Sequence, residues 1–510
     1  MREPLTTHRS SPIGRRLADA VDVHVGLAGP FGRGDVSGQI YRQLRGAVRE
    51  GRLSPGDRLP PTRELARRLG VSRTTTSVAY DRLISEGFAF ARIGSGTFVS
   101  DVAVASTARR APVAVIRPLP AWEGIRLPSY LWPPADYDFR PGVPDVNLFP
   151  FRTWRRLMGR QFQPSVVGRG VNGHPAGEES LRAAIAHHVG LARGIRATAE
   201  NIVVTNGTQQ AIDLIGRTLL RSGDQVAVED PGYGPPVRLL SSMGARVRSV
   251  PVDNEGLVVD EIPPGTRLVY VTPAHQLPLG MTMSPSRRVA LLAWAARHDG
   301  VIIEDDYDSE FRFGGRPVEP LHLLDESGRV VYVASFSKTT LPTLRLGFIV
   351  APPSLWPALH AAKFLTDWHS AVPLQGAMAE FIVEGHFARH VRRMRLVYEA
   401  RHRLIRDVLT DRFSSELRVI PSAAGLHISA AAPGLSVDEI EAIVRRASQL
   451  GVECHPLALF ALAQPPLPGL VLGYGAITVD RIEAGLGRLH RAMFRESGRS
   501  STPDSARQRG

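Results

Sequence analysis

The sequence predicts an α/β fold with a largely parallel sheet, preceded by a small helical domain that ends in a β-hairpin. From about residue 135 onward, short runs of β-branched residues alternate with helical stretches, as in strands buried on both faces of a sheet. Before them, a compact basic segment shows apolar residues at helical spacing. With 510 residues, 43% hydrophobic and 22% charged, the chain is long enough to bury several cores.

Composition divides the chain into five parts. We expect an irregular N-terminus over residues 1–35, the basic segment over 36–100, a proline-rich linker over 101–134, the α/β region over 135–495 and a disordered polar tail over 496–510. The N-terminus offers no apolar run for a signal peptide or a membrane span, so we expect a cytosolic protein. The single cysteine, Cys454, excludes an intramolecular disulfide and agrees with a reducing compartment.

Three helices are predicted in the basic segment. The first runs from a cap at Ser37 to Gly51, and the second from a cap at Thr62 to Gly70. The third spans residues 73–86. Its packed face is formed by Thr76, Ala79, Tyr80 and Leu83, and its opposite face by Thr74, Ser77 and Val78.

A β-hairpin is expected after the third helix, because residues 88–93 and 97–100 flank the permissive turn Gly94-Ser95-Gly96. This order is the winged helix-turn-helix arrangement, which places one helix in the major groove of DNA. Residues 37–100 carry eleven arginines against five acidic residues, within a chain of net charge +13. We therefore predict DNA binding; the alternative is a helical cap with a solvated basic face.

The basic segment resembles the GntR-type DNA-binding domain. The matching strings are Leu59-Pro60-Pro61-Thr62-Arg63-Glu64-Leu65-Ala66, Leu69-Gly70-Val71-Ser72-Arg73-Thr74-Thr75 and Gly94-Ser95-Gly96-Thr97-Phe98-Val99. The resemblance implies that Arg63 and Arg73 contact DNA, that Ser77 faces the groove with Thr74 on the same face, and that Gly94 forms the tip of the wing. Many members have a basic residue at Ser77 or Val78, and this chain has none there.

Polar residues follow the predicted strands of the α/β region. The strands are Ile202 to Thr205, Gln225 to Val228, Leu268 to Thr272, Val301 to Glu304 and Val330 to Ala334. Four polar strings follow them: Asn206-Gly207-Thr208-Gln209, His275-Gln276, Asp305-Asp306-Tyr307-Asp308 and Ser335-Phe336-Ser337-Lys338. Because ligands bind at the carboxyl ends of parallel strands, we expect a binding site at this edge.

These strings contain the groups that pyridoxal phosphate requires. A turn that opens a helix, Gly207-Thr208-Gln209, presents backbone N–H groups to a phosphate. Ser335, Ser337 and Arg345 add donors for the same group. This combination predicts a phosphate-binding end of the site.

The remaining groups suit the ring and aldehyde of that cofactor. Asp305 is placed to hold a protonated ring nitrogen, Tyr307 to donate to a phenolate oxygen and Tyr233 to stack on the ring. The chain has only two lysines, and Lys338 is the predicted Schiff-base residue. Lys363 lies among alanines and is expected to be a helix residue with its ammonium in water.

Each of these features also has an ordinary explanation. The acidic string from Asp305 could be a solvated loop or a Mg²⁺ site, Gly207 a helix entry and Tyr233 a half-buried aromatic residue. The ordered set together favours pyridoxal phosphate. A nucleotide site is disfavoured because the glycine-rich motifs are absent from the sequence. No metal site is predicted, since His386 and His390 lack a third ligand and are expected on a surface face.

From Asp138-Phe139-Arg140-Pro141-Gly142 to about Leu489 the chain resembles the fold-type I, aminotransferase-like pyridoxal phosphate proteins, which have a large and a small subdomain. The resemblance implies that Lys338 is the Schiff-base lysine, Arg345 the phosphate arginine and Asp305 the partner of the pyridine nitrogen, with Gln276 beside the ring oxygen. Aminotransferases bind the substrate α-carboxylate with an arginine where this chain has Val471. Ordinary amino-acid transamination is therefore not expected.

The order of a GntR-type head, a linker and an aminotransferase-like body resembles the MocR/GabR family of bacterial transcriptional regulators. The resemblance implies a head-to-tail homodimer that binds double-stranded operator DNA. Pyridoxal phosphate, alone or joined to an amine, would act as its effector. The alternative is a working aminotransferase with a DNA-binding appendage; we expect at most residual half-reactions.

Overall fold

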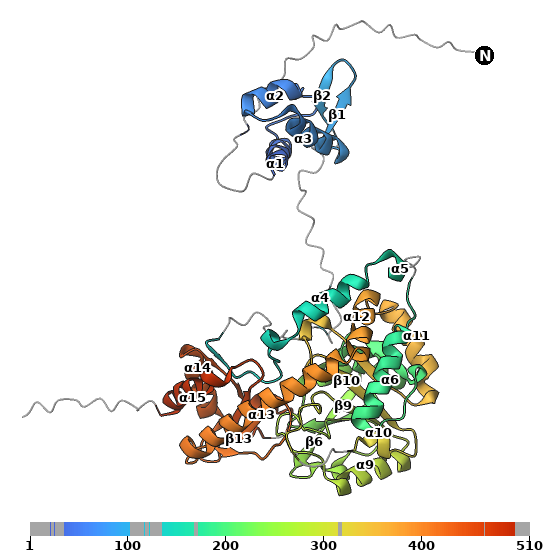
Figure 1. Ribbon diagram of the computed structural model, residues 1–510, viewed down its shortest axis with the longest axis vertical. Helices are drawn as coiled ribbons and strands as arrows, with labels where there is room; N and C mark the ends of the chain where they lie inside the picture. Colours follow the sequence, from blue (N-terminus) through green and yellow to red (C-terminus); the bar gives the residue numbers. More distant parts are fainter. Residues whose placement is uncertain are drawn as a thin grey trace, which may run out of the picture. The chain divides into compact units, whose positions relative to one another are not determined.

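A computed structural model of the chain describes residues 35–101, 135–167, 172–314, 319–463 and 465–494, together with Val21, Val25, Arg117 and Trp122. The predicted irregular N-terminus, linker and tail lie almost entirely outside these residues. The chain divides into two compact units, Met1–Pro118 and Leu119–Gly510 (Figure 1). Among the described helices, none combines the length and the apolar composition needed to cross a membrane.

The first unit contains three helices and a hairpin: α1 (Val36–Arg49), α2 (Thr62–Leu69), α3 (Arg73–Ser85), β1 (Ala89–Arg92) and β2 (Gly96–Val99). Its core joins all three helices through Leu44, Leu65 and Leu83. The strands pair antiparallel, with Arg92 opposite Gly96 across the turn. Helix, turn, helix and hairpin thus follow in the predicted order.

Two helix caps differ from the prediction. Asp35, not Ser37, caps α1, because its carboxylate precedes the helix and accepts the N–H of Gly38 at 3.1 Å. Thr62 is the first residue of α2 rather than its cap; Pro61 precedes it, and the Pro61 carbonyl accepts the N–H groups of Glu64 and Leu65. The predicted stop at Gly70 is confirmed by its left-handed backbone, with φ of 63°.

The second unit is built on an eight-stranded sheet of order β4-β11-β10-β9-β8-β5-β6-β7. The strands are β4 (Ile202–Thr205), β5 (Gln225–Asp230), β6 (Arg246–Asp253), β7 (Gly256–Leu257), β8 (Thr266–Val271), β9 (Val301–Asp306), β10 (Val330–Ser335) and β11 (Gly347–Val350). All five predicted runs are strands, and only β7 and β11 run in the direction opposite to the other six strands of this sheet. Asp305 and Asp306 end β9 rather than follow it.

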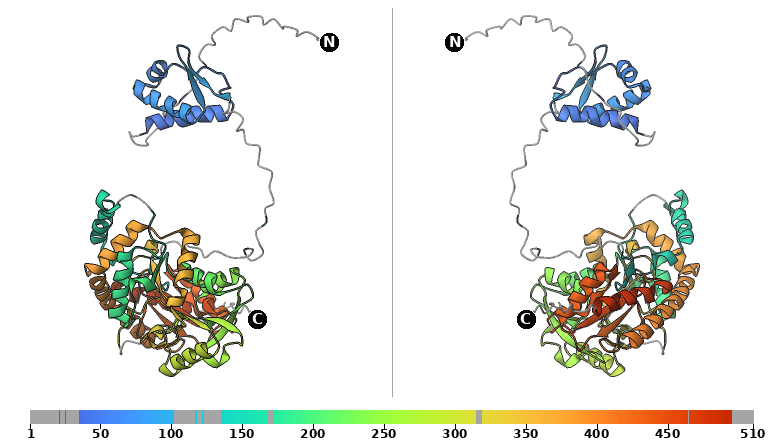
Figure 2. Two further views of the ribbon diagram at one scale, coloured as in Figure 1. Left: turned by 90° about the vertical axis from the view of Figure 1, so that its right-hand side faces the viewer. Right: turned by 90° about the vertical axis from the view of Figure 1, so that its left-hand side faces the viewer.

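Helices cover both faces of this sheet (Figure 1, Figure 2). Alternate strand residues separate the two cores: Val203 packs with one set of helices, and Ile202 and Val204 with the other. The first set is α7 (Thr208–Leu219), α8 (Gly234–Ser242) and α11 (Trp356–Asp367). The opposite face carries α6 (Glu179–Arg193), α9 (Pro285–Arg297), α10 (Leu321–Leu324) and α12 (Val372–Val383).

A smaller subdomain follows, drawn from orange to red in Figure 1. Its four-stranded sheet has the order β12-β13-β16-β15. Its elements are α13 (His386–Arg412), β12 (Arg418–Val419), β13 (His427–Ala431), α14 (Val437–Gln449), β14 (Val452–Glu453), β15 (His455–Pro456), β16 (Gly469–Gly473) and α15 (Val479–Met493). Three earlier elements complete the unit: β3 (Tyr137–Asp138), which pairs with β14, α4 (Phe151–Arg160) and α5 (Pro164–Val167).

The expectation for the histidine pair of α13 is partly wrong. His390 is buried, not on a surface face, because its ring packs edge-on against Phe149 with ring centres 5.7 Å apart. Burial lowers its pKa to about 4, so the imidazole is neutral at physiological pH. His386 is half-buried and lies 3.0 Å from the Glu384 carboxylate.

Candidate functional site

The carboxyl ends of β4, β9 and β10 lead into residues predicted to bind the cofactor. Residues after two of these strands also meet residues from elsewhere in the chain. A Cβ atom on Gly207 would lie 2.8 Å from the Arg345 guanidinium, and one on Gly142 would lie 2.8 Å from the Lys338 ammonium. Both glycines also have positive φ angles, 84° and 76°. The positive φ angles favour glycine at both positions, and the short approaches place the ends of the Arg345 and Lys338 side chains directly against these two glycines.

Lys338 follows β10 and is half-buried. Its ammonium donates to the carbonyl of Gly142 at 2.8 Å. Burial lowers the pKa of Lys338, while the carboxylates of Asp308 and Asp305 oppose this shift. The lowered pKa favours the neutral amine, which is the form that attacks a carbonyl carbon.

Asp305 is a buried carboxylate with one unsatisfied oxygen. Its Oδ2 accepts from the Tyr270 hydroxyl at 2.6 Å, whereas Oδ1 has no hydrogen-bond partner among the described residues. Burial raises the pKa of Asp305 to about 7. An unpaired buried acceptor is costly, so this oxygen fits a donor that a ligand brings, such as a protonated ring nitrogen.

We call Gly207, Thr208, Ser335, Ser337 and Arg345 the phosphate seat. Gly207 is the cap residue of α7, where backbone N–H groups and the helix dipole favour an anion. The Arg345 guanidinium donates to the Asn206 carbonyl at 2.8 Å. Ser335 Oγ donates to Ser337 Oγ at 2.9 Å. Gln209, also predicted for this group, is exposed in the first turn of α7.

Three residues are predicted to contact the cofactor ring, and two of them, Gln276 and Tyr307, donate to backbone carbonyls in the structure. The Gln276 amide donates to the carbonyls of Pro231 and Leu277, both at 2.8 Å. The Tyr307 hydroxyl donates to the His275 carbonyl at 2.9 Å. Tyr233 caps α8 and is 36% exposed. The roles of these residues toward a ring stay predictions.

Lys363 is buried, so the expectation of a solvated ammonium is wrong. The residue is 0% exposed because α11 packs on the sheet beside α7. Its ammonium donates to both oxygens of Asp367 at 2.7 Å. The spacing of Lys363 and Asp367, four residues apart on a helix, was the available sequence signal for this ion pair.

A buried polar cluster next to Tyr307 was not predicted. Its members are His275, Asp308 and His427. Each offers one possible metal-ligand atom, and these three atoms lie within 4.8 Å of one another. Both rings already have protein partners: His275 Nδ1 lies 3.0 Å from Asp308, and His427 Nε2 lies 2.9 Å from the Pro278 carbonyl. Burial lowers the pKa of His427 to about 3, so its ring is neutral.

Val471 occupies β16 opposite Ser429 of β13. It is fully buried and packs with Leu279 and Leu457. Its other cross-strand partner is His455 of β15. The position at which the resemblance predicts loss of an arginine thus carries an uncharged, buried side chain.

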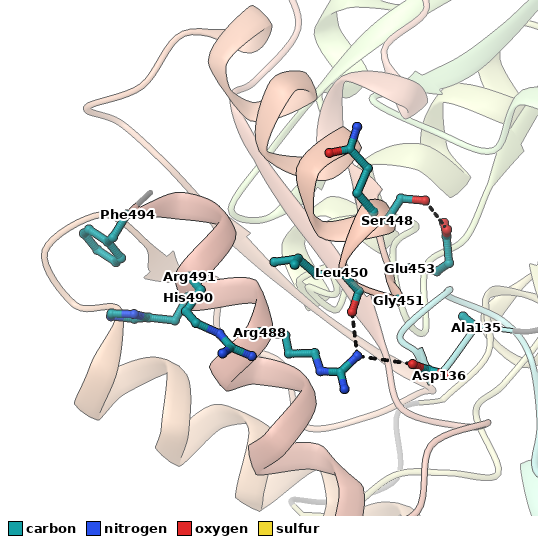
Figure 3. A pocket seen from close by; sticks show the side chains of 11 residues that line it. Ala135, Asp136, Ser448, Leu450, Gly451, Glu453, Arg488, His490, Arg491 and Phe494 are labelled. Atoms are coloured by element: carbon teal, nitrogen blue, oxygen red, sulfur yellow. Dashed lines mark hydrogen bonds and ion pairs between the residues drawn. The ribbon is translucent and has the colours of Figure 1, made fainter. Parts of the chain in front are cut away.

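A cavity of about 850 Å³ lies in the smaller subdomain, away from these residues (Figure 3). Figure 3 shows Arg488 reaching the carboxylate of Asp136 and the carbonyl of Leu450, at 3.2 and 2.8 Å. Ser448 donates to Glu453 at 2.5 Å. The lining contains none of the residues predicted to bind the cofactor.

The predicted DNA-contacting residues of the first unit lie on its surface. Arg63 of α2 and Arg73 and Thr74 of α3 are exposed, and Ser77 is half-buried. Gly94 is exposed at the turn of the hairpin, with φ of 75°. Its neighbour Ile93 is fully exposed, which sequence reasoning had not singled out.

Comparison with known proteins gives matches to both units. Residues 36–99 match the bacterial regulatory proteins of the gntR family, and residues 166–433 match aminotransferase class I and II. The probable rhizopine catabolism regulatory protein MocR of Rhizobium meliloti is 39% identical, over 89% of this chain and 93% of its own. The regulator TauR of Rhodobacter capsulatus is 34% identical, over 93% and 100%. The pyridoxine biosynthesis regulator PdxR of Corynebacterium glutamicum is 30% identical, over 89% and 95%.

Solved structures resemble the second unit. The kynurenine aminotransferase of Pyrococcus horikoshii matches with a TM-score of 0.65 and 26% identity, over 71% of this chain and 91% of that one. The α-aminoadipate aminotransferase LysN of Thermus thermophilus matches with a TM-score of 0.63 and 29% identity, over 70% and 91%.

Proposed function

Because the chain belongs to the MocR/GabR family of GntR-type transcriptional regulators, we propose that its second unit senses pyridoxal phosphate, alone or joined to an amine, and thereby controls operator binding. The protein is a DNA-binding transcriptional regulator with a pyridoxal phosphate-dependent, aminotransferase-like domain.

The unsatisfied Oδ1 of Asp305 is the observation that carries the proposal. When bound, pyridoxal phosphate supplies an aldehyde on an electron-withdrawing ring, which forms a covalent link to an amine. Lys338 would provide that amine and Asp305 would keep the ring nitrogen protonated. Arg345 and the start of α7 would hold the phosphate, and Tyr233 would stack on the ring.

The uncharged side chain of Val471 favours a sensor over an enzyme. Turnover of an α-amino acid needs its carboxylate held so that the Cα–H bond stands correctly for cleavage. Val471 offers no charge, and it is buried between Ser429 and His455 on the neighbouring strands. We propose that the protein acts as a cytosolic, head-to-tail homodimer and retains at most residual half-reactions.

Loading with pyridoxal phosphate is expected to change operator affinity by about 1–3 kcal/mol, the usual range for two linked sites. An effector changes DNA affinity only if it binds two conformations of the protein with different affinities. The measurement is the dissociation constant of operator DNA for cofactor-free and loaded protein at one salt concentration, because phosphate contacts are salt-dependent. Equal affinity in both states, together with rapid keto-acid production, would favour the enzyme.

Replacing Arg73 by alanine is expected to weaken operator binding by about 1–3 kcal/mol if a bidentate base contact is lost. Arg63→Ala should behave similarly, and both variants should bind pyridoxal phosphate normally. The control is Arg52→Ala, which removes an exposed arginine paired with Glu50 outside α2, α3 and the hairpin. Normal operator binding by Arg73→Ala would exclude that residue from the interface.

A further inference from the structure

Lys363 and Asp367, both on α11, form an ion pair in which Lys363 is buried and Asp367 is half-buried. The proposed cofactor site does not use this pair directly. The ammonium of Lys363 donates to both Asp367 oxygens at 2.7 Å, to Gln210 Oε1 at 3.0 Å and to Ser370 Oγ at 3.1 Å. Burial lowers the pKa of Lys363, and Asp367 opposes the shift. A buried ammonium with this many acceptors is held in one place.

The same pair reaches the turn that begins α7. Asp367 Oδ2 accepts from the side-chain amides of Asn206 and Gln210, at 2.9 and 2.8 Å. Gln210 Oε1 in turn accepts the backbone N–H of Asn206 at 2.8 Å. The Asn206 carbonyl accepts from Arg345 at 2.8 Å. Asn206, the residue before Gly207, is therefore fixed at its N–H, its side chain and its carbonyl.

We infer that Lys363 and Asp367 are positioning residues for the phosphate seat, acting through Asn206 and Gln210. Their opposite charges largely cancel at the distance of a bound phosphate, so direct attraction contributes little. Instead, they fix the position of the Asn206-Gly207 turn. In that position the first backbone N–H groups of α7 and the Arg345 guanidinium can bind the same phosphate. This inference rests on the proposed cofactor site.

The double variant Lys363→Met/Asp367→Leu tests this role. Removing both partners leaves no unpaired charge beside the buried position of Lys363, and the Asp367 position is half-buried, so we expect the full-length variant to fold. Asn206 and Gln210 nevertheless lose their shared acceptor. Binding of pyridoxal phosphate and of pyridoxal, which lacks the phosphate, is measured by absorbance titration. The dissociation constant of pyridoxal phosphate should rise about tenfold, and that of pyridoxal by less than about twofold.

Two further variants complete the test. Asn206→Ala removes one contact without touching a buried charge, and it should show a smaller loss with the same preference for the phosphorylated ligand. Arg217→Met removes another ion pair of the i,i+4 type, between Arg217 and Asp213 toward the end of α7, and should change neither affinity.

An unchanged ratio of the two dissociation constants in the double variant and in Asn206→Ala would overturn the inference. If the double variant does not fold, the ratio of the two dissociation constants in Asn206→Ala alone supports or overturns the inference. Failure of the wild-type protein to bind pyridoxal phosphate would instead contradict the proposed site, so the two failures are distinguishable.

Discussion

Replacing Lys338 by alanine is expected to abolish covalent attachment of pyridoxal phosphate. The chain has only two lysines, and the ammonium of Lys363 is enclosed by Asp367, Gln210 and Ser370. After borohydride reduction, the intact mass of the wild-type protein should increase by one reduced cofactor per chain, whereas that of Lys338→Ala should not change. Non-covalent binding through the phosphate seat should persist in the variant, although more weakly.

The control for this experiment follows from the burial of Lys363. A substitution at Lys363 is not neutral, because it disturbs Asp367 and through it Asn206. Peptide mapping of the reduced wild-type protein is therefore the better control, and it should place the cofactor on the peptide that contains Lys338. A label on Lys363 would overturn the site assignment.

The sheet could be predicted from the sequence because its strands are buried on both faces. Runs such as Ile202 to Thr205 and Val301 to Glu304 contain β-branched residues without the alternation of a half-exposed strand. All five predicted runs form strands of one sheet, and their carboxyl ends carry Gly207, Asp305 and Lys338. The order of strands and polar residues along the chain was sufficient to predict where the site lies, because parallel strands place their carboxyl ends at one edge of the sheet.

The contacts that support this edge could not be predicted in the same way. Lys363 and Asp367 lie on one helix, but Asn206 precedes and Gln210 lies in α7, which is far away in the sequence. The cluster of His275, Asp308 and His427 likewise joins the large subdomain to β13 of the small one. Such pairs depend on the packing of elements, which local spacing does not contain.

Replacing Asp305 by asparagine is expected to weaken binding of pyridoxal phosphate about a hundredfold at neutral pH, since breaking a buried ion pair costs about 3 kcal/mol or more. The asparagine amide has nearly the shape of the carboxyl group but carries no charge to balance a protonated ring nitrogen. Absorbance titration of the full-length variant measures the change. Wild-type affinity in this variant would show that Asp305 does not face the ring nitrogen.

The pH dependence of binding tests the same contact. Burial, with Asp306 and Asp308 adding to it, raises the pKa of Asp305 to about 7, while Tyr270 and Lys338 oppose the shift. Below that pH the cofactor-free protein holds a proton that must leave before the carboxylate can pair with a cation. Wild-type affinity should therefore fall by up to about tenfold per unit below pH 7. The affinity of Asp305→Asn for pyridoxal phosphate should not show this fall below pH 7.

Stability separates a lost contact from a damaged fold. The pKa of Asp305 in the folded protein lies above that of an unfolded aspartate, so the native state binds more protons between roughly pH 4 and pH 7. The free energy of unfolding of the cofactor-free protein therefore falls as the pH rises through this window. Asparagine is neutral at every pH and still accepts from Tyr270. Cofactor-free Asp305→Asn should consequently unfold at a higher temperature than the wild type at pH 8, although it binds the cofactor more weakly. A lower unfolding temperature would mean that native contacts already stabilise the Asp305 carboxylate without a cationic ligand.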